Sequence, residues 1–73
     1  MNTVRIYIDE NLDAYHLRSL KQAIQDIPHV LDVTFSEKEP HEVMVEYDAQ
    51  QNMPVKIIET LRQQGYHPDI LSA

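Results

Sequence analysis

The stretch VRIYIDENLDAYHLRSLKQAIQDI, residues 4–27, changes its apolar period partway along. Every second residue from Val4 to Ile8 is aliphatic, which is typical of a β-strand with one buried face. The apolar residues of the second part recur at steps of three and four: Leu17, Leu20, Ala23, Ile24 and Ile27. That spacing predicts an amphipathic helix, which either Asn11 or Asp13 can cap at its start.

The following residues predict a hairpin and a second helix. Alternating apolar residues favour strands around residues 30–35 and 43–47, joined by the polar connection 36–41. Pro54 suits the first turn of a helix, and Gly65 suits the left-handed residue that often ends one. A second helix is therefore expected between these two positions.

The last segment, residues 67–71, is expected to form a fourth strand at a sheet edge, since Pro68 cannot donate the hydrogen bond that a central strand requires. The order βαββαβ favours a ferredoxin-like sandwich of the α+β class. In that fold, two helices cover one face of a four-stranded antiparallel sheet. A chain of 73 residues can build one core, so residues 1–73 are expected to form a single domain.

The composition narrows the class of function. The chain has no cysteine, which excludes a disulfide framework, a cysteine-based zinc site, an iron–sulfur cluster and a thiol nucleophile. Twelve acidic and six basic residues give a formal net charge of -6, which disfavours nucleic acid and anionic membranes and favours metal cations or basic protein surfaces. No apolar run is long enough to span a bilayer and no signal segment is recognisable, so a cytoplasmic protein is expected.

Several segments, in this order, carry a family resemblance: VRIYI at 4–8, Ala-Ile at 23–24, PHVLDV at 28–33, VMVEYD at 43–48 and IIETLRQQGY at 57–66. They resemble the heavy-metal-associated domains of copper chaperones and metal-transporting ATPases, over nearly the whole chain. In that family, a loop with the pattern Met-x-Cys-x-x-Cys follows the first strand. The resemblance implies the ferredoxin-like fold and a role in metal binding.

The positions of the family cysteines are occupied by other potential metal ligands. Counting without a gap, from Ile8 forward or from Ala23 backward, places these positions on Asp13 and His16, and the loop methionine on Asn11. Copper(I) prefers thiolate or thioether sulfur, whereas carboxylate and imidazole suit zinc, nickel, cobalt, iron(II) or copper(II). We therefore expect a divalent transition metal and do not expect copper(I).

The predicted metal site consists of Asp13, His16 and His67. The first two share one side of the opening helical turn, and the resemblance places His67 beside that end of the helix. Glu10 and Tyr66 are expected as outer contributors to the site. Two or three mixed donors leave coordination positions open, which suits metal trafficking or sensing more than storage.

Other interpretations remain open at this point. Asp13 suits a simple helix cap, and His29 and His41 are expected to be solvated and away from the site. No enzymatic activity is expected, because so short a chain offers neither a water-excluding pocket nor an oxyanion-type loop. The alternative function is a metal-free interaction or assembly module, which joins a homodimer or a basic protein partner through an exposed sheet edge or face.

Overall fold

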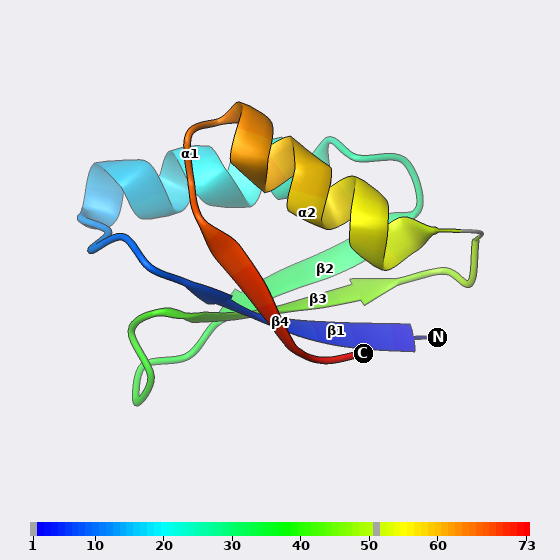
Figure 1. The fold of residues 1–73 in the computed structure, drawn as a ribbon, viewed down its shortest axis with the longest axis horizontal. Coiled ribbons are helices and arrows are strands. Elements are labelled where there is room, and N and C mark those ends of the chain that lie inside the picture. The colour runs from blue at the N-terminus through cyan, green and yellow to red at the C-terminus, as the bar shows by residue number, and fades with distance from the viewer. Residues whose placement is uncertain (1, 51) are drawn as a thin grey trace.

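The computed structural model describes residues 2–50 and 52–73, and its six elements follow the predicted order (Figure 1). They are β1 (Asn2–Ile8), α1 (Ala14–Gln25), β2 (Val30–Phe35), β3 (Glu42–Tyr47), α2 (Met53–Gln63) and β4 (Pro68–Ser72). Neighbouring strands are antiparallel, and the sheet has the order β2-β3-β1-β4. The predicted ferredoxin-like fold of the α+β class is confirmed.

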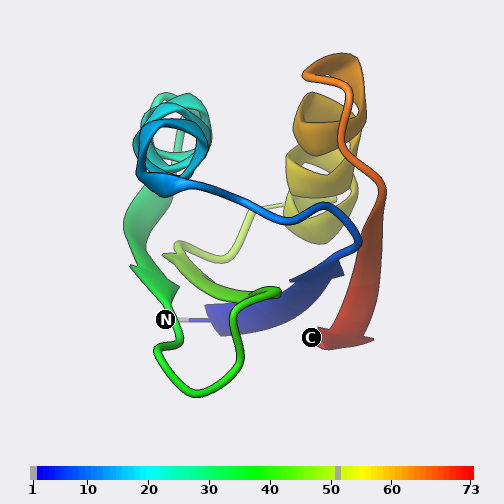
Figure 2. The ribbon, with the colours of Figure 1, turned by 90° about the vertical axis from the view of Figure 1, so that its left-hand side faces the viewer.

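Both helices lie on one face of the sheet, and the opposite face is open (Figure 2). The alternation in β1 explains this arrangement, because Val4, Ile6 and Ile8 are buried toward the helices while Arg5 and Tyr7 face the other way. The core between the two layers consists of these buried residues: Val4, Ile6, Ile8, Leu20, Ile24, Val33, Val43, Val45, Tyr47, Met53, Ile57, Ile58 and Leu61. Within the described ranges, neither helix is long and apolar enough to cross a membrane.

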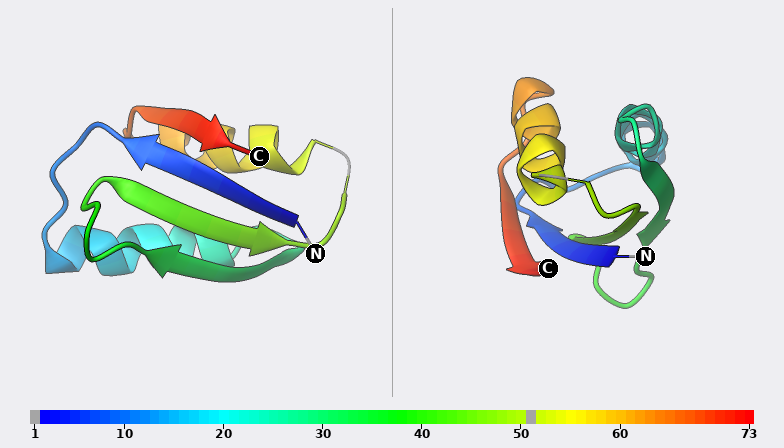
Figure 3. Two further views of the ribbon diagram at one scale, coloured as in Figure 1. Left: turned by 90° about the horizontal axis from the view of Figure 1, so that it is seen from below. Right: turned by 90° about the vertical axis from the view of Figure 1, so that its right-hand side faces the viewer.

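The ends of the helices set the position of two neighbouring connections. α1 begins directly after Asp13, which has an extended backbone conformation. α2 is followed by Gly65 with a φ of 91°, a left-handed conformation that favours glycine and turns the chain back toward β4. Strand β4 lies at one edge of the sheet beside β1, as the view from below shows (Figure 3). The expected roles of Gly65 and of β4 as an edge strand are confirmed.

Candidate functional site

The candidate site lies where the loop between β1 and α1 meets the turn between α2 and β4. The backbone N–H of Asp9 donates a hydrogen bond of 3.2 Å to the carbonyl oxygen of His67, which joins the two connections. The residues predicted for the metal site belong to these connections or to the first turn of α1: Glu10, Asp13, His16, Tyr66 and His67. The structure therefore brings all of them to the same end of the molecule.

Asp13 and His16 form a contact pair at the start of α1. One Asp13 carboxylate oxygen, Oδ1, accepts a hydrogen bond of 2.8 Å from the backbone N–H of His16 and lies 2.7 Å from its ring atom Nδ1. These hydrogen bonds, first the backbone one and then the side-chain one, lower the pKa of the Asp13 carboxyl. Asp13 is thus a helix cap, and it also orients an imidazole. Both side chains are exposed.

Glu10 and His67 form a second pair of the same kind. Glu10 Oε1 accepts a hydrogen bond of 2.9 Å from the backbone N–H of His67, and Oε2 lies 2.5 Å from ring atom Nδ1. The side-chain hydrogen bond is the main cause that lowers the pKa of Glu10 and raises the pKa of His67. Both residues were expected near the site, but no pattern in the sequence indicated that they form a pair.

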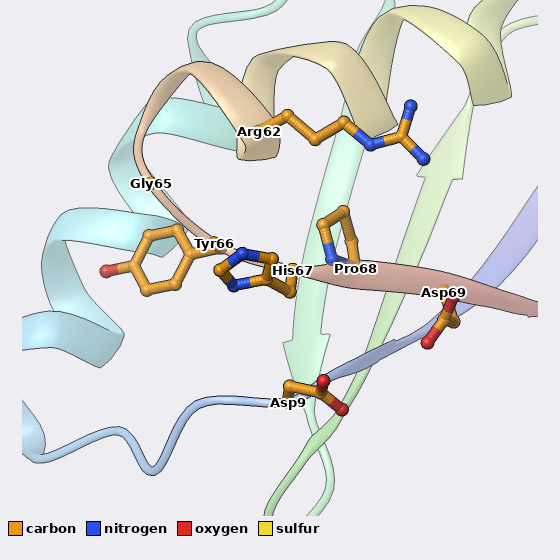
Figure 4. A pocket seen from close by; sticks show the side chains of 7 residues that line it. All are labelled: Asp9, Arg62, Gly65, Tyr66, His67, Pro68 and Asp69. Carbon is orange, nitrogen blue, oxygen red and sulfur yellow. The ribbon is translucent and has the colours of Figure 1, made fainter.

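Tyr66 lies between the two pairs. Its side chain packs against the edge of the core and lines the same surface hollow as His16 and Glu10. Figure 4 shows the phenol ring of Tyr66 directed toward α1. Burial raises the pKa of Tyr66, and the charges of Glu10 and Asp13 add to the effect.

The two carboxylate–imidazole pairs do not converge into one cluster. Among residues 2–50 and 52–73, no three side chains of histidine, cysteine, aspartate or glutamate are placed to hold a metal ion together. The described arrangement consequently brings together Asp13 and His16, while His67 is paired with Glu10. A common site formed by Asp13, His16 and His67 stays a prediction.

His41 belongs to the surroundings of the site, although we expected it to be solvated and distant. Its Nδ1 donates hydrogen bonds to the carbonyl oxygens of Ile8 (2.8 Å) and Glu10 (3.1 Å), and its own carbonyl oxygen accepts one from the N–H of Ile8. Its ring also stacks on Tyr7. That expectation was wrong because the hairpin connection folds back onto the end of β1, a contact with no local sequence signal.

The Glu10–His67 pair predicts a specific pH dependence of stability. The raised pKa of His67 stabilises the fold below the ordinary value of 6.5, and this contribution is lost as pH rises through the raised value. The lowered pKa of Glu10 stabilises the fold above 4.5, and this contribution is lost as pH falls through the lowered value. In urea unfolding, Glu10→Gln is therefore expected to lower the free energy of unfolding most between pH 4.5 and pH 6.5.

NMR titration of the histidine rings supplies an independent readout for the same variant. In Glu10→Gln, the pKa of His67 is expected to return toward its ordinary value, since the neutral amide no longer favours the imidazolium. Glu37→Gln removes the same charge from the exposed hairpin connection and serves as the control. An unchanged His67 titration in Glu10→Gln would show that the pair does not exist in solution.

Solved structures with the same fold include a copper transporter domain and the N-terminal domains of two other proteins. The N-terminal domain of PacS from Synechocystis PCC6803 matches with a TM-score of 0.82 at 19% identity, over 99% of this chain and 100% of that one. The yeast copper transporter domain CCC2A, solved in apo and Cu(I)-loaded states, matches with a TM-score of 0.84 at 17% identity, over 97% of this chain and 96% of that one. The N-terminal domain of ZntA, solved in its Zn(II) form, matches with a TM-score of 0.82 at 15% identity, over 97% of this chain and 94% of that one.

At these low identities, the TM-scores show a shared fold. No protein-family model matches the chain, and comparison with curated proteins gives no match. The resemblance to heavy-metal-associated domains is confirmed at the level of the fold, with a chain that contains no cysteine.

Proposed function

We propose that this chain handles a divalent transition-metal ion, which His16 binds through its Nε2 atom. The Asp13–His16 pair supports this proposal most directly. These two residues occupy the positions that the family resemblance assigns to metal-binding cysteines. Asp13 Oδ1 lies 2.7 Å from His16 Nδ1. Domains of this fold have been solved with Cu(I) and with Zn(II), which makes metal handling the first function to test.

The contact through Nδ1 prepares the imidazole for a metal. Histidine ligands of metals usually direct one ring N–H to a carboxylate or a carbonyl, which fixes the tautomer and leaves the other nitrogen as the donor. Asp13 has this relation to His16, and Glu10 has it to His67. In this proposal the imidazoles are the ligands, the carboxylates orient them, and His67 is the second donor that approaches the ion.

The donor set also bears on the choice of ion. Imidazole nitrogen suits zinc, nickel, cobalt, iron(II) or copper(II), and the chain contains no thiolate for copper(I). Asp9, Glu10 and Asp13 place three carboxylates in the loop before α1, which raises the local concentration of cations. Two protein donors leave positions for water or for ligands of a partner, so binding is weak and suits trafficking or sensing.

A metal-free interaction module is the second candidate function. One observation favours it: both carboxylates already accept two hydrogen bonds within the chain, so the pairs need no ion to be satisfied. In that case, Asp13 and Glu10 serve only to hold the helix start and the two connections in place. Metal titration separates the two candidates.

The test is an NMR titration of isotope-labelled protein with Zn²⁺, Ni²⁺ and Cu²⁺, and separately with Cu(I) under reducing conditions. We expect divalent ions at slight excess to shift the amides of residues 9–17 and 65–68 and the ring signals of His16, reversibly with chelator. Cu(I) is expected to cause no comparable shift. If no divalent ion perturbs these signals, the metal proposal is rejected and the interaction module remains.

A further inference from the structure

The outer face of the sheet is the side opposite the helices, seen from below in Figure 3. Its centre contains apolar side chains that the metal site does not use. Tyr7 and Met44 lie on this face and are 37% and 40% exposed. In the β1–β3 register Arg5 opposes Met44 and Tyr7 opposes Glu42, so Tyr7 and Met44 are diagonal neighbours. The ring of Tyr7 is fixed by stacking on His41, with ring centroids 5.2 Å apart.

Carboxylates surround this apolar centre. Asp32 on β2 opposes Glu46 on β3. Asp69 on β4 opposes Tyr7 on β1. In the described part of the chain, none of these three carboxylates forms an ion pair, whereas Arg5 is paired with Glu42. The face therefore presents unpaired negative charge around an apolar middle, a layout common to the rim and core of protein interfaces.

The negative charge of this face is local and does not simply follow the acidity of the chain. The two helices carry four cations and one anion, a net charge of +3: Arg18, Lys21, Lys56 and Arg62 against Glu59. The four strands carry one cation and four anions, a net charge of -3: Arg5 against Asp32, Glu42, Glu46 and Asp69. The two layers of the sandwich are thus oppositely charged.

We propose that the outer sheet face is a docking surface for a basic region of another protein. Lysine or arginine side chains of the partner pair with Asp32, Glu46 and Asp69, and an apolar or aromatic side chain covers Tyr7 and Met44. The sign of the face excludes phosphate-rich partners such as nucleic acid or anionic lipid. This surface goes beyond metal handling, and its occupancy does not depend on a bound ion.

A second copy of the chain is a poorer occupant than a basic protein. If the sheet faces of two copies met, a strand layer with a net charge of -3 would face another with the same charge. Each whole chain also carries a net charge of -6. The helices of a second copy offer positive charge, but its overall charge still repels the first copy. Self-association is accordingly a separate outcome that the experiment detects.

The probe is a synthetic peptide of alternating lysine and aromatic residues, titrated into isotope-labelled protein and followed by NMR. We expect the amides of Tyr7 and Met44 to shift, together with that of Thr3, which opposes Glu46 in the β1–β3 register. Glu46→Lys is expected to weaken binding about 10-fold more than Glu37→Lys, which makes the same change of net charge in the exposed hairpin connection. Asp69→Lys is a second sheet variant in case Glu46→Lys impairs folding.

Three results would overturn the docking proposal. The first is equal weakening by Glu37→Lys and the sheet variants, which would show attraction to the overall charge only. The second is a set of shifts confined to the loop at residues 9–13. The third is a concentration-dependent mass of the chain alone in sedimentation that Glu46→Lys abolishes, which would make a second copy the occupant.

Discussion

Replacing His16 with alanine is expected to weaken Zn²⁺ binding by more than about 10-fold, because even the outer partners of metal ligands are worth about 10–100-fold in affinity. The fold should persist, since the side chain is exposed and lies outside the core. Isothermal titration calorimetry or competition with a zinc dye measures the change. Circular dichroism verifies the fold of the variant.

Two further variants assign the roles within the site. Asp13→Asn keeps a side chain that caps helices well but removes the charge, so it should weaken binding less than His16→Ala does. His29→Asn removes an imidazole from the turn after α1, where the residue has a positive φ that asparagine tolerates, and should leave affinity unchanged. Equal losses in His16→Ala and His29→Asn would contradict a specific site.

Replacing Leu20 with alanine is expected to lower the free energy of unfolding by about 2–5 kcal/mol, the usual cost of a buried leucine truncation. Leu20 is 1% exposed and lies on the face of α1 that packs on the sheet. Because small domains have a total stability of only about 5–15 kcal/mol, this loss can leave much of the protein unfolded. Urea denaturation measures the difference.

The matched control for the core is another leucine. Leu31 on β2 is 52% exposed, so Leu31→Ala is expected to change stability by no more than about 0.5 kcal/mol. Similar losses for the two leucines would mean that α1 does not pack on the sheet as described.

The fold was predictable because local patterns specify its elements. The alternation from Val4 to Ile8 predicts a strand, and the spacing around Leu20 predicts a helix, and each element must bury its apolar face in the same core. Only a few topologies accommodate this order of strands and helices. Gly65 and Pro68 also marked the end of α2 and the edge strand correctly. The helix start at Asp13 followed from its capping preference.

The site was less predictable because its contacts join distant segments. The Asp13–His16 contact follows from a spacing of three residues at a helix start. The Glu10–His67 pair spans 57 residues, and the hydrogen bond of His41 to Ile8 spans 33. Such contacts depend on how two loops meet after the sheet has formed, and neither composition nor periodicity contains that information.

The opposite charges of the helical and strand layers contribute an electric dipole moment along the direction in which the two layers are stacked (Figure 1). In the field of a cationic protein, such a dipole experiences a torque before any contact is made, so the strand layer turns toward the approaching surface. At physiological ionic strength the field decays over about 8 Å, so this alignment acts only in the last stage of an encounter. The charge pattern on which the docking proposal rests is therefore also expected to shorten the search for the correct orientation.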